Sequence, residues 1–178
     1  MPHREVNDDK YFTSVYLRSN FIFDEIFEEK DEMFVIIRWF KDIEPYTSFN
    51  NGLNIFPDMI KDKNILNEAV LIEKGRYIEK NGDLSGISYQ YVFTCRKHDV
   101  DYRRILKAIA NSDHARYPYT SNQVFFINIE KNIIYYLYDD RGLDLISNNM
   151  MNLKSIYMKF NDWILDNDRE RINKIFED

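Results

Sequence analysis

Apolar side chains recur at three- and four-residue spacing in three segments of the chain, which is the pattern of an amphipathic helix. In the first segment, which Asp8 or Asp9 can cap, the stripe consists of Phe12, Val15, Ile22, Ile26 and Phe27. In the middle segment, at residues 101–111, it consists of Tyr102, Ile105, Leu106 and Ile109. In the last segment, which Asn149 or Asn152 can cap, it consists of Leu153, Ile156, Tyr157, Phe160 and Ile164. The pattern therefore predicts three helices.

Segments between these helices carry the pattern of β-strands. Residues 33–40 are mostly β-branched or aromatic at successive positions, so we predict a central strand that is covered on both faces. Residues 87–94 alternate bulky apolar residues with mostly small or polar ones, as in an antiparallel strand with one exposed face. Residues 69–72 and 76–78 supply a partner strand, because the Asn81-Gly82 pair that follows them is a hairpin signal.

The remaining segments complete an α+β fold. Residues 124–129 and 133–138 predict a second hairpin, and a turn then leads into a short strand at residues 143–146, so a meander lies at the centre of the sheet. We predict a mainly antiparallel sheet of about five or six strands. It is packed by an N-terminal helix, a middle helix and C-terminal helices.

Two regions lie outside these regular patterns. Residues 42–64 contain turn-forming residues and predict a loop with a short helical turn at Pro57. Residues 166–168 predict a break in the last helix, after which Asp168 caps a final turn. No repeat or low-complexity linker divides the chain, so residues 1–178 are expected to form a single α+β domain.

Composition excludes several classes of partner. The 178 residues carry a net charge of −6, which repels a phosphate backbone, so we expect no nucleic acid partner. The longest apolar run, at residues 33–37, is too short to span a bilayer, so we expect no membrane association. Cys95 is the single cysteine and cannot form an intramolecular disulfide, which favours a cytoplasmic location.

The motifs of common cofactor sites are missing from the sequence. Three scattered histidines and one cysteine do not supply the closely spaced ligands of a zinc site. The five glycines are dispersed rather than clustered before a helix, as a phosphate-binding loop requires. We therefore expect no metal and no cofactor. Cys95 ends a predicted strand and is interpreted as a buried apolar residue rather than a nucleophile paired with His98 or His114.

One polar cluster has two interpretations. The side chains of Asp139, Asp140, Arg141 and Asp144 follow each other closely around Gly142. The first interpretation is a hairpin turn, in which Gly142 adopts a conformation that other residues avoid. The alternative is the polar cluster of an enzyme, a phosphoryl or nucleotide hydrolase, because convergent carboxylates and a guanidinium are the groups that such chemistry uses.

Tyrosines are the candidate binding residues. Tyr89 and Tyr91 belong to one predicted strand, and Tyr136 and Tyr138 belong to another. Tyrosine is enriched at protein interfaces because its ring covers apolar area while its hydroxyl keeps a polar contact. Sheet faces and cores also use tyrosine, so the pattern by itself leaves both roles open.

Several strings of the sequence resemble a known family. They are VFFIN at residues 124–128, YDDRG at residues 138–142 followed by Asp144, NDWILD at residues 161–166 followed by DRE at residues 168–170, and the start YFxxVYxR and IFxEIF at residues 11–18 and 22–27. These strings are similar to domain of unknown function 3885, a family of uncharacterised bacterial proteins, over nearly the whole chain. The resemblance implies a bacterial origin, a cytoplasmic location and one compact domain, and it carries no established activity.

These observations favour a binding protein over an enzyme. We expect a non-catalytic protein-binding module, such as an immunity protein that neutralises a toxin by covering it, because the chain is acidic, rich in tyrosine and without a convergent catalytic set. The alternative is the hydrolase built on the cluster at residues 139–144. A third candidate is a regulatory subunit without a site of its own, and the sequence leaves the oligomeric state open.

Overall fold

The structure, a computed structural model, describes residues 8–42, 53, 55–114 and 116–176. Its strands form one six-stranded antiparallel sheet in the order β2-β3-β1-β4-β5-β6. The strands are β1 (Glu32–Asp42), β2 (Val70–Ile78), β3 (Leu84–Arg96), β4 (Gln123–Asn128), β5 (Ile133–Asp139) and β6 (Gly142–Ile146). The predicted α+β class and number of strands are therefore confirmed.

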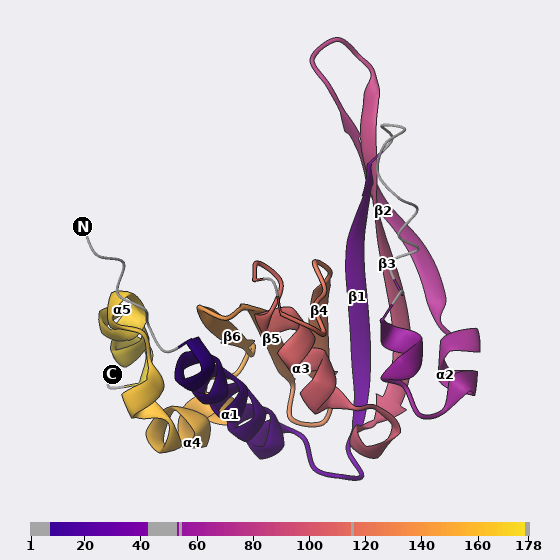
Figure 1. The fold of residues 1–178 in the computed structure, drawn as a ribbon. Coiled ribbons are helices and arrows are strands. Elements are labelled where there is room, and N and C mark those ends of the chain that lie inside the picture. The colour runs from indigo at the N-terminus through magenta and orange to yellow at the C-terminus, as the bar shows by residue number, and fades with distance from the viewer. Residues whose placement is uncertain (1–7, 43–52, 54, 115, 177–178) are drawn as a thin grey trace.

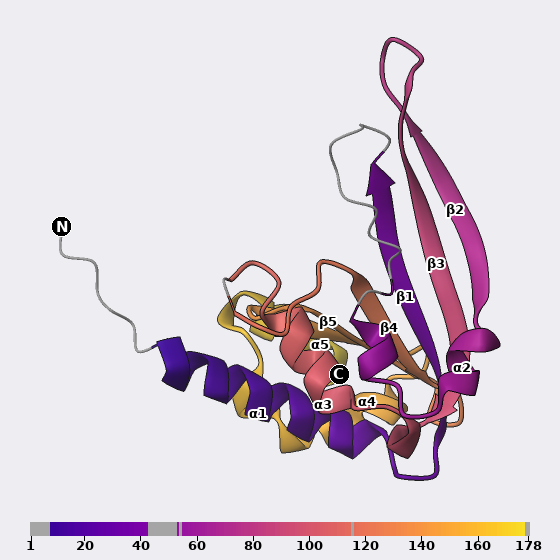
Figure 2. The same cartoon turned by 45° about the vertical axis from the view of Figure 1, so that its right-hand side comes forward.

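The helices lie on one side of this sheet and at one end of it. They are α1 (Asp8–Ile26), α2 (Lys63–Asn67), α3 (Tyr102–Ala110), α4 (Met151–Lys159) and α5 (Asp166–Phe176), with 3-10 turns η1 (Phe56–Asp58), η2 (Lys97–Asp99) and η3 (Asn161–Trp163). Figure 1 shows α1 and α3 in front of the sheet, with α4 and α5 beyond its β6 edge. In Figure 2, β1, β2 and β3 extend well past the helices as an arm.

The centre of the sheet differs from the prediction. The meander β4-β5-β6 forms one half of the sheet, and β1 lies at the centre between β3 and β4. The meander is not central because β1, which comes early in the chain, pairs with β3 along its whole length and with β4 along half of it. The predicted hairpin around Gly82 is confirmed, since Gly82 has a φ of 92° in the turn between β2 and β3.

The prediction that β1 is covered on both faces is wrong. Met33, Val35 and Ile37 are fully buried beneath the helices. On the opposite face, Phe34 is 36% exposed and Phe40 is 52% exposed. Apolar side chains on both faces of a strand predict that a layer of structure covers each face, whereas the described helices cover only one face of β1.

The C-terminal helices also differ from the prediction in their limits. The helix predicted to run through Ile164 ends at Lys159, and α5 already begins at Asp166, two residues before the predicted cap. The guanidinium of Arg169 donates to the Ile164 oxygen at 2.9 Å and to the Asn161 oxygen at 3.2 Å, which stabilises the turn between the helices. Part of the loop predicted at residues 42–64 lies outside the described residues, but the helical turn at Pro57 is confirmed as η1.

Aromatic rings form the core between the helices and the sheet. Phe23 of α1 stacks on Phe27 with ring centroids 4.4 Å apart and on Tyr102 of α3 at 4.5 Å. It meets Phe126 of β4 edge-on at 5.0 Å and Tyr135 of β5 at 5.3 Å. Tyr135 is fully buried, and its hydroxyl donates to the Ser19 carbonyl oxygen at 3.0 Å, so its polar atom is satisfied within the core.

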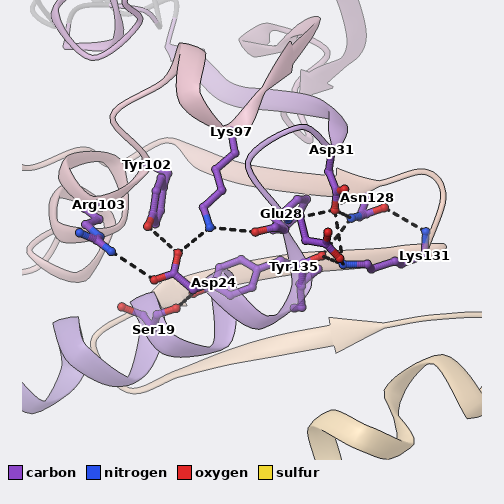
Figure 3. Close-up of polar contacts among 12 residues, drawn as sticks. Ser19, Asp24, Glu28, Asp31, Lys97, Tyr102, Arg103, Asn128, Lys131 and Tyr135 are labelled. Atoms are coloured by element: carbon purple, nitrogen blue, oxygen red, sulfur yellow. Dashed lines mark hydrogen bonds and ion pairs between the residues drawn. The ribbon is translucent and has the colours of Figure 1, made fainter.

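Two lysines and an asparagine from outside α1 cap the C-terminal end of this helix (Figure 3). The Lys97 ammonium donates to the Phe27 carbonyl oxygen at 2.8 Å, and Asn128 and Lys131 each donate to the Ile26 carbonyl oxygen at 3.0 Å. The last turn of α1 contains no basic residue of its own. Positive charge at this end is favourable because helix dipoles place partial negative charge on the final carbonyls. η2 and the β4–β5 turn are therefore tied to α1.

Asp24 joins this cap to α3. Its carboxylate forms an ion pair with Lys97 at 2.7 Å and accepts hydrogen bonds from the Tyr102 hydroxyl at 2.5 Å and the Arg103 guanidinium at 3.2 Å. Burial raises the pKa of Asp24, but the hydrogen bonds from Lys97, Tyr102 and Arg103 and the Lys97 charge outweigh this effect and lower the pKa overall. The Lys97 side chain is only 7% exposed, so its charge depends on Asp24 for compensation.

We predict that the two faces of the sheet tolerate truncation differently. Phe126→Ala empties a fully buried site on the helix side and should lower the free energy of unfolding by about 3–4 kcal/mol. The matched change Phe34→Ala, on the opposite face, should cost about 1–2 kcal/mol because the ring is already partly in water. Urea unfolding measures both, and equal losses would show that the second face is covered after all.

Replacing Lys97 should destabilise the protein. Lys97→Met leaves the Phe27 carbonyl without this donor and Asp24 without its closest cation. We expect the free energy of unfolding to fall by about 2 kcal/mol, a value that takes into account the partial exposure of Asp24. Lys154→Met changes an exposed lysine of α4 and should alter stability by less than about 0.5 kcal/mol. Urea unfolding at neutral pH compares the two, and a harmless Lys97→Met would contradict the role of the cap.

The lowered pKa of Asp24 predicts a loss of stability in acid. A carboxyl with a lower pKa in the folded state stabilises the fold fully above its unfolded pKa of about 3.9, and this contribution is lost as the pH falls through the folded-state value. Between about pH 5 and pH 2, wild type should therefore lose more stability than Asp24→Asn. Asp31 and Asp139 also have lowered pKa values, but both are present in the two proteins. If wild type and Asp24→Asn lost the same stability over this pH range, Asp24 would not be the source of the acid sensitivity.

Candidate functional site

The sheet face opposite α1 and α3, here called the open face, carries two rows of side chains that cross the strands. One row consists of Val70, Val92, Ile36, Phe125, Tyr136 and Asp144. The next row consists of Thr94, Phe34, Ile127, Ile134 and Ile146. Among the described residues no helix covers these rows, so an almost continuous apolar band is open to solvent.

Aromatic side chains extend the open face onto the arm. Phe40 of β1 contacts Tyr77 of β2 edge-on, with ring centroids 5.0 Å apart. The Phe40 ring lies directly over Gly86 of β3, where a Cβ atom would come within 1.9 Å of it. Glycine is therefore required at position 86 for the ring to lie flat on the strand.

Arg38 is a cation at the middle of this face and is held in a fixed position. The Gln90 amide, oriented with its oxygen toward Arg38, accepts hydrogen bonds from Nε at 2.8 Å and from Nη2 at 2.7 Å. The guanidinium also lies 5.6 Å from the centre of the Phe125 ring. Within the part of the chain that the structure describes, no carboxylate forms an ion pair with Arg38.

The predicted binding tyrosines divide between the two faces. Tyr136 and Tyr138 point to the open face, where Tyr136 stacks on Phe125 with centroids 4.3 Å apart. Burial raises the pKa of Tyr138, and Asp144 and Asp139 raise it further, so its hydroxyl stays protonated. Tyr89 and Tyr91 lie on the helix side of the arm and stack on Trp39 at 5.3 and 4.7 Å.

The apolar residues of the open face were not predicted as site residues. Besides Phe34 and Phe40, they include Ile127 and Ile146, which cross-strand pairing with Ile134 brings into one row. The signal was present in residues 33–40, where both alternating faces are apolar. Such a strand is either covered twice within its own chain or has one face available to another molecule.

The polar cluster at residues 139–144 does not converge on one point. Asp139 is buried and accepts hydrogen bonds from the backbone and side chain of Arg141, so these two groups close the turn on themselves. The Arg141 side chain lowers the pKa of Asp139. Asp144 lies opposite Tyr136 on the open face, away from this pair. The expectation that Gly142 adopts a conformation other residues avoid is wrong, since Gly142 has no positive φ; glycine fits here because the Tyr138 ring packs over it, where a Cβ atom would clash with the ring.

Asp140 instead joins the turn to the start of α1. One of its carboxylate oxygens accepts a hydrogen bond from the Tyr11 hydroxyl at 2.9 Å, and the other lies 3.2 Å from Nε2 of His114. Burial and the bond to Asp140 raise the pKa of Tyr11 to about 12. A shallow hollow of about 440 Å³ adjoins His114 and includes Arg116, whose guanidinium pairs with Asp9 at 3.0 Å.

The cysteine considered as a nucleophile lies in surroundings that favour a structural role. Cys95 is buried on the helix side of β3, and burial raises the pKa of its thiol to about 12, which keeps the nucleophilic thiolate scarce. The described residues contain no group of three or more His, Cys, Asp or Glu side chains placed to hold a metal ion. None of the described helices is long and apolar enough to cross a membrane.

Comparison with known proteins identifies relatives but no solved structure. The sequence model of a family described as Domain of unknown function (DUF3885) matches residues 2–168. An uncharacterized protein of Bacillus subtilis (strain 168), YnaE, is 30% identical over 161 residues, which cover 87% of this chain and 75% of the relative. No solved structure matches the chain significantly. The match over most of the length, through both the helix side and the open face, shows that the chain belongs to the DUF3885 family.

Proposed function

We propose that this chain is a non-catalytic protein-binding module that recognises its partner with the open face of the sheet. The observation that carries the proposal is the exposure of large apolar side chains across this face: Phe34, Phe40, Val70, Ile72, Tyr77, Tyr138 and Ile146. Each leaves roughly 60–110 Å² in water, given side-chain areas of about 150–250 Å². The total of about 600 Å² reaches the upper end of the patches found on ordinary monomers, roughly 300–600 Å².

The rigidity of this face supports the same proposal. Its strands belong to one hydrogen-bonded sheet, and Gln90 fixes the guanidinium of Arg38 within it. A preformed surface loses little conformational entropy on binding, and fixed arginines and aromatic rings are frequent anchors of protein interfaces. Tyr136 and Tyr138, two of the four tyrosines expected to bind a partner, contribute to it.

The kind of partner follows from charge and surface type. The net charge of −6 favours association with a basic protein, and a flat apolar face suits the covering of another folded surface. An immunity-type protein that blocks a toxin in the bacterial cytoplasm requires these properties and no catalytic group. We therefore place a basic bacterial toxin first among the partners to test.

The competing hydrolase has weaker support. Asp139 and Arg141 satisfy each other, and Asp144 lies on the open face. Asp140 contacts Tyr11 and His114, so it holds the turn against α1 and against the turn that follows α3. A shared reaction centre needs these groups around one substrate atom, and the turn directs them to three different places.

The experiment compares an isoleucine and a leucine, which have the same size and nearly the same exposure but lie on opposite sides of the molecule. Ile146, on the open face, is 50% exposed, and Leu17, on α1, is 51% exposed. A protein captured from the native host by wild type is purified, and its affinity for Ile146→Glu and Leu17→Glu is measured by calorimetry. We expect Ile146→Glu to weaken binding at least about tenfold, because it buries a charge in the interface, and Leu17→Glu to leave it unchanged.

The contrary results are equally specific. Capture of no protein in repeated experiments at low salt, or equal effects of the two substitutions, would refute the proposal. Thermal unfolding of both variants serves as the control for folding. Because both side chains are already half in water, each variant should unfold close to the wild-type temperature.

A further inference from the structure

We infer that the open face also pairs with the open face of a second copy of this chain, forming a two-fold dimer in which Arg38 of each copy meets Asp144 of the other. This inference rests on the proposed role of the face as a protein-binding surface. It names a second copy of this chain as a molecule that binds the open face, and another protein partner would have to displace that copy.

The charges of the face are self-complementary. Arg38 lies on β1 and Asp144 on β6, and both side chains belong to the same face. Among the described residues neither forms an ion pair; Arg38 is held by Gln90 and Phe125, and Asp144 lies near enough to Arg171 of α5 to interact with the charge of that arginine. A two-fold interface requires that each residue find its complement on an identical surface, and one cation and one anion at separate points of the face meet this condition.

The strand order brings these charges into reach. A two-fold axis that runs parallel to the strands, between β4 and β5, places β1 of one copy over β6 of the other. The charges lie about 7 Å on either side of such an axis, since neighbouring strands are about 4.8 Å apart. Along the strand direction, Arg38 of one copy lies one row, or about 7 Å, from Asp144 of the other. An arginine side chain is long enough to span this distance. Packed sheets are about 10 Å apart, which leaves room for the side chains between them.

Apolar side chains surround the axis. Phe125 of β4 and Tyr136 of β5 stack on each other and would meet the same pair of the second copy. Ile127 and Ile134, which pair across the same two strands, lie in the next row. In this arrangement only β1, β4, β5 and β6 of each copy face the other copy, so the buried area is smaller than the whole open face and below the total of about 1,200 Å² at which stable specific interfaces begin. We therefore expect a dimer that dissociates reversibly on dilution.

The test is a charge exchange followed by sedimentation of the purified chain over a wide range of concentration. Wild type should show a concentration-dependent dimer. Arg38→Glu and Asp144→Arg should each raise the dissociation constant at least about tenfold, because each places like charges opposite one another twice. An equal mixture of the two variants should dimerise again, since both contacts then join opposite charges. The double variant should also recover the dimer.

The control is Asp162→Arg, which reverses an exposed charge of η3 outside the open face and should leave the dimer unchanged. A chain that is monomeric at every concentration would overturn the inference. A dimer that the single variants do not weaken, or a mixture that does not restore it, would do the same. Thermal unfolding checks each variant, and Asp144→Arg, on an edge strand, keeps the test valid if Arg38→Glu disturbs Gln90.

The two proposals can fail separately. If charge exchange has no effect on self-association while Ile146→Glu still abolishes binding of a captured partner, only the dimer is refuted. If the charge exchange controls the dimer but partner affinity is the same for Ile146→Glu and Leu17→Glu, the dimer stands and the proposed function is refuted.

Discussion

The capped C-terminal end of α1 is the constraint on which the arrangement of the molecule depends. Lys97 and Lys131 carry positive charge to the last carbonyls of this helix from two different parts of the sheet region, and Asp24 compensates the buried ammonium of Lys97. These contacts fix α1, and α3 through Tyr102, against one face of the sheet. The opposite face is left without a helical layer among the described residues, and the functional proposals follow from that asymmetry.

Much of the fold could be predicted from the sequence because local patterns determine it. The stripe that includes Phe12 and Ile22 gave α1, and the turn at Gly82 gave the hairpin of β2 and β3. The position of β1 between β3 and β4 could not be predicted, since non-local pairing leaves no periodic signal. The break between α4 and α5 was misplaced because the contacts of Arg169 with Asn161 and Ile164 determine it.

The candidate site was harder to predict than the fold. Tyr136 and Tyr138 lie on the open face, whereas Tyr89 and Tyr91 lie on the helix side against Trp39. Alternation places residues on a face but does not say which face the helices cover. Phe34 was therefore assigned to a covered surface, although its exposure is what distinguishes this sheet. Charge pairs such as Asp140 with His114 depend on folding and give no signal in the sequence.

Hydroxyl-radical footprinting of the dilute chain, read by mass spectrometry, tests the central claim most directly, because it reports solvent contact side chain by side chain. The account predicts that Phe34 and Phe40 are oxidised far faster than the buried Phe126 and, after correction for intrinsic reactivity, more slowly than the more exposed Tyr117. Oxidation of Phe34 and Phe40 as slow as that of Phe126 would contradict it, because the face would then be covered within the chain itself.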